Sequence, residues 1–91
     1  MRHRPLGPER DHTMLLQTMG KVVELDFAAV FEAGALEQEE WAGMVTACRG
    51  CEWVSGCRKW LRAAKRGDAC PMQCRNRAAL AGLSAKQGLI A

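Results

Sequence analysis

All five cysteines of this 91-residue chain lie within a stretch of 27 residues. The first three follow the spacing Cys-x2-Cys-x5-Cys, and the fourth is followed directly by a proline. Thiolate sulfur is a ligand for zinc and for iron–sulfur clusters, so thiols at this density predict a metal centre or redox chemistry. The five residues are Cys48, Cys51, Cys57, Cys70 and Cys74.

The redox state expected for these thiols depends on the compartment. Basic residues follow Met1 without the apolar run that completes a secretory signal. No stretch approaches the roughly 18 apolar residues that a membrane span requires. We therefore expect a cytoplasmic protein with no membrane partner, in which clustered cysteines are metal ligands or redox groups rather than permanent disulfides.

Zinc and an iron–sulfur cluster are the two candidate occupants. Structural zinc sites usually combine two Cys-x2-Cys knuckles, or one knuckle with paired histidines. Here three residues separate Cys70 from Cys74, and His3 and His12, far upstream, are expected to be exposed and not ligands. The spacing of the first three cysteines resembles that of the iron–sulfur loop of helix-hairpin-helix DNA glycosylases and of WhiB-like regulators, although their fourth ligand lies upstream. A 4Fe-4S cluster is therefore favoured, with zinc as the alternative.

A second resemblance spans residues 15–83. Three segments carry it: Cys48-Arg-Gly-Cys51, Cys57-Arg-Lys-Trp60-Leu61 and Cys70-Pro71. They resemble the motifs Cys-Arg-x-Cys, Cys-x-x-Trp-Leu and Cys-Pro-Asn-Ala of a family of short, cysteine-rich proteobacterial proteins, a domain of unknown function. The resemblance implies that Cys48, Cys51, Cys57 and Cys70 are the ligands. Where that family reads Asn-Ala, this chain has Met72-Gln73-Cys74-Arg75 before Asn76, so Cys74 is additional to the motif.

The elements expected to position the cysteines are helices, so the predicted fold class is all-α, a bundle of four to five short helices around the metal site. Apolar residues recur at helical spacing over residues 11–24. Asp26 and Gly34 are the expected cap and stop of a second helix over residues 27–33. A single domain over residues 11–84 is expected between a mobile segment at residues 1–10 and a frayed tail at residues 85–91.

Three further helices are expected to bring the cysteines together. Glutamates open a third helix that ends near Cys48, on its apolar face. A fourth helix has Cys57 near its start, and Cys70 is the expected N-cap of a last helix over residues 71–83. Cys48, Cys57 and Cys70 would then meet where helix ends converge.

Cys74 fits this arrangement less well. At 3.6 residues per turn, it lies roughly 150° around the expected last helix from the mean direction of Leu80 and Leu83. We therefore expect its side chain to point away from the core. Three roles stay open for it: an alternate or exchanging ligand, a resolving redox thiol, and an inert surface cysteine.

Two tryptophans bracket Cys57. Trp53 and Trp60 are candidates for an aromatic shell that excludes water from a cluster, which is one way in which a protein tunes a reduction potential. The same residues at helical spacing also suit an ordinary apolar core.

Charge is divided unevenly between the two halves of the chain. Residues 1–47 carry four basic and eight acidic side chains, whereas residues 48–91 carry nine basic and two acidic ones. A localised positive field attracts anions, so the basic half is a candidate surface for nucleic acid or an acidic partner. The alternative is that these basic residues form ordinary solvent-exposed faces of helices. The candidate anion-binding residues are Arg58, Lys59, Arg62, Lys65, Arg66, Arg75 and Arg77.

The sequence predicts a binding protein rather than an enzyme. No serine, histidine and acid arrangement and no glycine-rich phosphate loop is evident. The predicted function is that of a small cytoplasmic iron–sulfur protein, a redox- or oxygen-responsive regulatory module with an unidentified protein partner. The alternatives are a structural zinc domain that mediates protein or nucleic-acid interactions and a small electron carrier.

Overall fold

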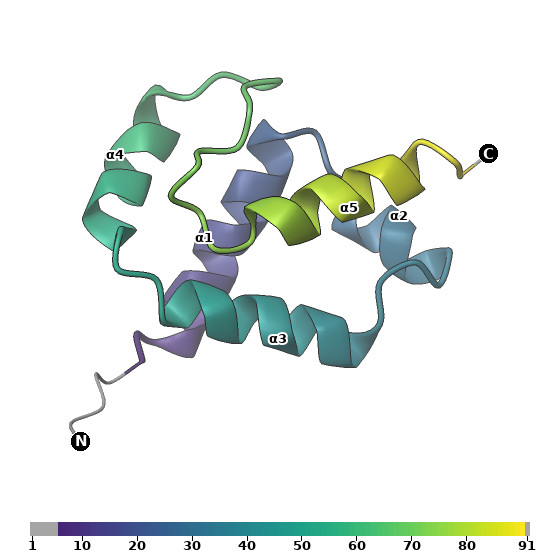
Figure 1. Cartoon of the computed structure of the whole chain (residues 1–91), viewed down its shortest axis with the longest axis horizontal. Coiled ribbons are helices and arrows are strands. Elements are labelled where there is room, and N and C mark those ends of the chain that lie inside the picture. The colour runs from purple at the N-terminus through teal and green to yellow at the C-terminus, as the bar shows by residue number, and fades with distance from the viewer. Residues whose placement is uncertain (1–5, 91) are drawn as a thin grey trace.

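Five α-helices make up the structure, a computed structural model that describes residues 6–90 (Figure 1). No strand occurs within these residues, which confirms the all-α fold class predicted from the sequence. None of the helices in the described range has the length and apolar composition needed to cross a membrane. The helices are α1 (Glu9–Val22), α2 (Phe27–Glu32), α3 (Gln38–Arg49), α4 (Val54–Ala63) and α5 (Arg77–Gln87).

Local sequence signals set the ends of α2 and α3. The Asp26 carboxylate caps α2 by accepting a hydrogen bond from the Ala29 N–H at 3.1 Å. Glu37 and Glu40 form a reciprocal capping box at the start of α3. Gly34 follows α2 with φ 75°, a left-handed conformation that glycine adopts without strain.

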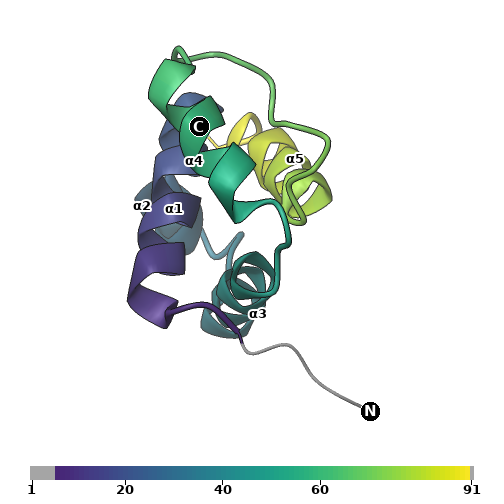
Figure 2. The same cartoon turned by 90° about the vertical axis from the view of Figure 1, so that its left-hand side faces the viewer.

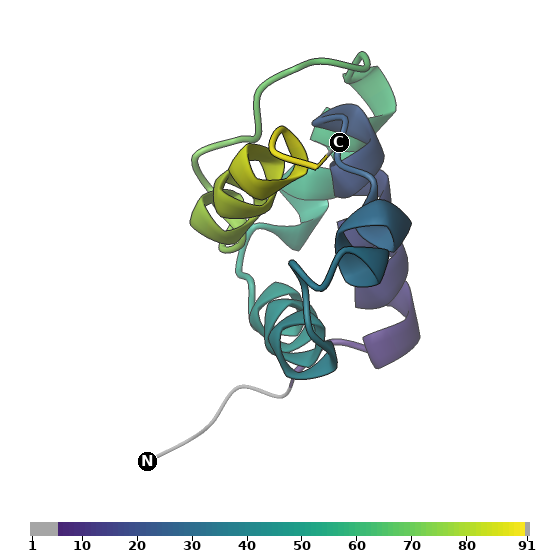
Figure 3. The same cartoon turned by 90° about the vertical axis from the view of Figure 1, so that its right-hand side faces the viewer.

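One apolar core joins α1, α2, α3 and α5. By contrast, α4 contributes no fully buried residue and packs beside α1 at the edge of the molecule (Figures 1 and 2). Figure 3 shows the opposite side, where α2 and the C-terminal end of α5 lie together. The buried apolar residues are Leu16, Met19, Leu25, Val30, Leu36, Met44, Val45, Leu80 and Leu83.

The last helix begins later than the sequence predicts. The prediction of a helix from about residue 71, capped by Cys70, is wrong, because α5 starts at Arg77 with Asn76 as its N-cap. Residues 64–76 form a loop, in which the Cys74 N–H donates to the Pro71 carbonyl at 3.1 Å. Proline suits the early position of a turn as well as the first turn of a helix, and here the turn forms.

α5 also continues past the end expected near residue 83, as far as Gln87. The Gln87 side chain accepts a hydrogen bond from the Asp26 N–H at 2.6 Å and donates one to the Glu24 carbonyl at 3.0 Å. These two bonds fasten the end of α5 to the turn between α1 and α2, so the helix does not stop at Ser84.

The segment before α1 is attached to α3. Residues 1–5 of the expected mobile segment lie outside the described residues, but α1 already begins at Glu9. The Gly7 N–H donates to the Arg49 carbonyl at 3.0 Å, and Arg49 Nε donates to the Gly7 carbonyl at 2.7 Å. Residues 6–10 are therefore held against the C-terminal end of α3.

Candidate metal centre

The C-terminal end of α3 positions the first two cysteines. Cys48 lies in the last turn of α3, and the Cys51 N–H donates to the Cys48 carbonyl at 3.1 Å, which makes a tight turn of the Cys-x2-Cys segment. The Trp53 N–H donates to the Cys51 sulfur at 3.4 Å. Hydrogen bonds of this kind orient a thiolate and stabilise its negative charge, which suits a metal ligand.

The first turn of α4 positions the third cysteine. The Cys57 N–H donates to the Trp53 carbonyl at 2.8 Å, so the helix begins directly after Trp53. The Trp53 indole lies across Gly56, where any side chain would meet its Nε1 atom. Glycine at this position therefore leaves room for the indole, and Trp53 lines the same cavity as the cysteines.

Four of the five cysteines line one small cavity of about 30 Å³. They come from α3, from the turn after it, from α4 and from the 64–76 loop, and α1 supplies apolar wall residues. Within residues 6–90, however, no three His, Cys, Asp or Glu side chains are grouped closely enough to hold one metal ion. The lining residues are Cys48, Cys51, Cys57, Cys74, Leu15, Leu16, Met19, Trp53, Val54, Arg75 and Asn76.

Cys74 does not point away from the core, so that expectation from the sequence is wrong. Its side chain is half-buried, packs against the core and lines the cavity. The expectation assumed a helix through residue 74, whereas Cys74 lies in the loop before α5. Cys70 is also half-buried against the core but does not line this cavity, and its thiol donates to the Pro71 carbonyl at 3.7 Å.

His12 is buried beside Cys48, contrary to the expectation of an exposed histidine. It is 3% exposed, and its Nδ1 lies 3.5 Å from the Cys48 sulfur, which donates to the His12 carbonyl at 3.6 Å. The missed signal is periodicity, because His12, Leu16 and Met19 stand at i, i+4 and i+7 on the buried face of α1. His3 lies outside the described residues.

The thiols of Cys48, Cys57 and Cys70 are protonated at neutral pH in the metal-free protein, because each has a raised pKa. Burial, followed by the repulsion of neighbouring thiolates, raises the pKa of Cys48 and of Cys57 to about 11. Burial, and to a lesser extent the neighbouring Cys74 thiol, raises the pKa of Cys70 to about 12. Nearby arginines, Arg58 and Arg77, act in the opposite direction. A bound cation would therefore have to displace these protons, and would remove the mutual repulsion as it did so.

The basic residues named from the sequence are all exposed. They lie on α4, on the 64–76 loop and at the start of α5. These segments also carry Cys57, Cys70 and Cys74, so the cations flank the cysteine site. Trp60, the second predicted shell residue, is half-buried against the core and does not line the cavity. The exposed cations are Arg58, Lys59, Arg62, Lys65, Arg66, Arg75 and Arg77.

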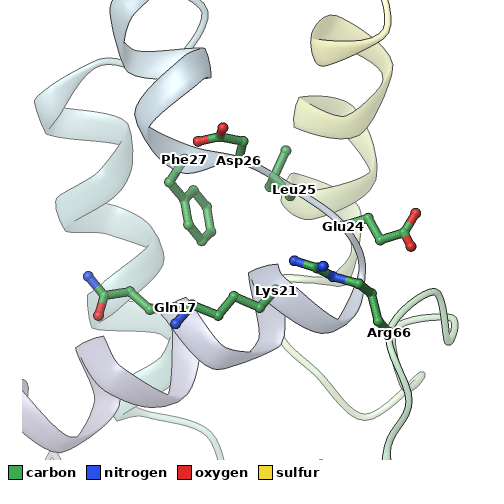
Figure 4. A pocket seen from close by; sticks show the side chains of 7 residues that line it. All are labelled: Gln17, Lys21, Glu24, Leu25, Asp26, Phe27 and Arg66. Carbon is green, nitrogen blue, oxygen red and sulfur yellow. The ribbon is translucent and has the colours of Figure 1, made fainter.

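A larger hollow of about 630 Å³ lies away from the cysteines, where α1 meets the start of α2. Figure 4 shows the Phe27 ring directed into it, with Lys21 on α1 and Arg66 on the loop after α4. Glu24 and Asp26 also line it, so its cations and acids balance. The hollow therefore favours neither an anionic nor a cationic ligand.

The fold and the cavity define a small, all-helical, cysteine-rich protein whose thiols gather where α1, α3, α4 and the 64–76 loop meet. Residues 3–86 match the model of a family described as "Family of unknown function (DUF6455)", and the chain belongs to this family. A search of curated proteins found no match, and a search of solved structures found none either.

Proposed function

We propose that the protein binds an iron–sulfur cluster, with 4Fe-4S favoured, and serves as a redox- or oxygen-responsive regulatory module. One observation carries the proposal: thiols from three separate segments of the chain line a single cavity with apolar walls. Cysteine thiolates are the usual ligands of such clusters. The five cysteines provide one more thiol than a four-ligand cluster needs.

The two candidate occupants place their sulfur ligands at different separations. A structural zinc ion draws its four sulfurs to about 2.3 Å from one point. In a cubane cluster each thiolate binds a different iron atom, so the four sulfurs stand further apart. The cavity of about 30 Å³ is small, and admitting a cluster requires α4 and the part of the 64–76 loop next to it to move outward. This movement disrupts little of the core, because α4 has no fully buried residue.

Regulation follows from the weak attachment of α4. A bound cluster would tie α4 and the 64–76 loop to α3, and loss of the cluster would release them. The released segments carry the exposed cations that flank the site, among them Arg58 and Arg62. Gain or loss of the cluster would thus change the basic surface offered to an unidentified protein partner or to nucleic acid.

The proposal places the protein in the cytoplasm, because thiolate ligation of iron requires reduced cysteines. It assigns the protein no catalytic activity and no membrane association. The chemistry of the site consists of holding the cluster and of changing shape when the cluster is oxidised or lost.

Anaerobic purification followed by metal analysis tests the proposal. We expect a brown protein that absorbs near about 400 nm, from thiolate ligation of iron, with iron and acid-labile sulfide in equal amounts. Cys48→Ser should be colourless, which controls for adventitious iron. A colourless wild-type protein with one equivalent of zinc would reject the cluster and support the structural zinc domain.

Exposure of the brown protein to air tests the sensing role. We expect the colour to bleach and the mobility of α4 to rise together. A stable and fully reversible redox couple, with no change in α4, would instead identify an electron carrier.

A further inference from the structure

Two cysteines, Cys70 and Cys74, are candidates for the fourth ligand of the proposed cluster, beside Cys48, Cys51 and Cys57. Cys70 and Cys74 lie four residues apart in the loop between α4 and α5, and both are half-buried against the core. They differ in what they face, because Cys74 lines the cavity that Cys48, Cys51 and Cys57 also line, whereas Cys70 does not.

A buried amide explains why Cys74 reaches the cavity. Asn76 is 4% exposed, and its Nδ2 donates to the Met44 carbonyl of α3 at 2.8 Å. Met44 lies one helical turn before Cys48, so this bond pins the end of the loop beside the first cysteine of the site. Cys74, only two residues before Asn76, is held at the same place.

Two successive turns fix the backbone of Cys74 itself. Its N–H donates to the Pro71 carbonyl at 3.1 Å, and its carbonyl accepts from the Arg77 N–H at 3.1 Å. The position of the thiol is thus set from both sides by the chain.

Cys70 directly precedes the same turn. Its thiol donates to the Pro71 carbonyl at 3.7 Å, the carbonyl that also accepts from the Cys74 N–H. Cys70 therefore shares this acceptor with Cys74 but does not line the cavity.

We propose that Cys74 supplies the fourth thiolate of the metal site and that Cys70 lies beside it as an unligated thiol. This assignment rests on the proposed metal centre and departs from the ligand set that the Cys-Pro motif implies. The additional residues of the loop thus provide a ligand in this chain.

Serine substitution at the two positions forms a matched pair within one loop. After anaerobic reconstitution with iron and sulfide, Cys70→Ser should keep the wild-type iron content and absorption, whereas Cys74→Ser should lose iron several-fold. Circular dichroism of the metal-free variants controls for folding. Iron loss in Cys70→Ser overturns the assignment, and so does full retention in Cys74→Ser. A wild-type protein that takes up no iron rejects the proposed function itself, which is a different outcome.

Alkylation of the wild-type protein gives a test that needs no variant. The iron-loaded protein is treated anaerobically with N-ethylmaleimide, and the modified cysteines are located by peptide mass spectrometry. The metal-free protein is treated in parallel. Metal-bound thiolates are protected, so we expect iron loading to slow modification at Cys74 and to leave the rate at Cys70 as it is in the metal-free protein. A rate at Cys74 that iron does not change, or a rate at Cys70 that iron lowers, overturns the assignment.

Discussion

At the scale of single residues, the cysteine site depends on polar groups that carry no obvious motif. His12 fills the space between Gly7 and Cys48, and any side chain at Gly7 would meet its ring. Asn76 closes the site from the other side through its bond to α3. Both residues are buried: His12 lies against the Cys48 sulfur, and Asn76 is hydrogen-bonded to the Met44 carbonyl. Within the described residues, no buried side-chain nitrogen or oxygen lacks a partner. The two polar side chains that border the site therefore have partners of their own.

The raised thiol pKa values predict that the metal-free protein is destabilised at alkaline pH. A thiol of ordinary pKa 9.0 ionises in the unfolded chain before Cys48 and Cys57, whose pKa is about 11 in the folded protein. The stabilisation is thus complete below about pH 9 and is lost as the pH rises through about 11. Thermal unfolding of the reduced, chelator-treated protein across this range measures the loss.

The control for this prediction is the double variant Cys48→Ser, Cys57→Ser. Its unfolding temperature should fall less over the same pH range, because two of the ionising groups are gone. Parallel pH profiles for the variant and the wild type would show that lysine deprotonation, and not the thiols, causes the loss.

Removal of the Asn76 amide should destabilise the fold and loosen the site together. Asn76→Ala removes the buried hydrogen bond from the loop to the Met44 carbonyl, which costs about 0.5–1.5 kcal/mol of unfolding free energy. Gln73→Ala, in the exposed part of the same loop, is the matched control and should change stability by less than about 0.5 kcal/mol. Urea denaturation measures the unfolding free energy of both metal-free variants. Equal values for Asn76→Ala and Gln73→Ala would show that the amide does not anchor the loop.

At the scale of elements, the sequence predicts those helices that carry their own signals. Periodicity and capping residues placed the first four helices within a few residues, because Asp26 and Glu37 act on their immediate neighbours. The loop before α5 was mistaken for a helix, since a Cys-Pro step suits both. The deciding contact, from Asn76 to Met44, joins residues 32 apart in sequence, which no local pattern reveals.

Prediction of the site has the same limit, because contacts between residues far apart in sequence leave no local pattern. Residue type and short spacing mark the cysteines and Trp53 as candidates in the sequence. The direction expected for the Cys74 side chain and the exposure expected for His12 were wrong, because both depend on which neighbour each segment meets in the fold.

The packing of α1 against α2 predicts opposite effects for two glycine substitutions. A Cβ at the buried Gly20 would meet the Phe27 ring, which packs edge-on against Trp41 at 4.9 Å between ring centroids. Gly20→Ala should therefore destabilise the protein by about 1–3 kcal/mol. Gly43→Ala, in an open position within α3, should stabilise it by about 0.5–1 kcal/mol through helix propensity.

Urea denaturation measures both effects with the same probe. Because the two substitutions add the same methyl group to a helix interior, their difference isolates the clash with Phe27. A Gly20→Ala variant as stable as Gly43→Ala would show that the ring moves aside without cost.

At the scale of the whole molecule, the cysteine site adjoins the apolar core, and Leu16 and Met19 belong to both. The fully buried residues of the helices come from α1, α2, α3 and α5, whereas α4 has none. We therefore expect the core to stay folded when the site is empty. The proposed cluster would instead decide whether the outer part of the molecule is ordered.

Hydrogen exchange should resolve these two regions. In the metal-free protein, α4 amides should exchange faster than α1 amides, because α4 buries no residue fully while α1 carries Leu16 and Met19 into the core. Reconstitution with iron and sulfide should slow exchange in α4 and in the 64–76 loop and leave α1 nearly unchanged, since α1 carries none of the proposed ligands. If metal binding protects α1 and α4 equally, the molecule folds around the metal as one unit, and local release of α4 cannot be the signal.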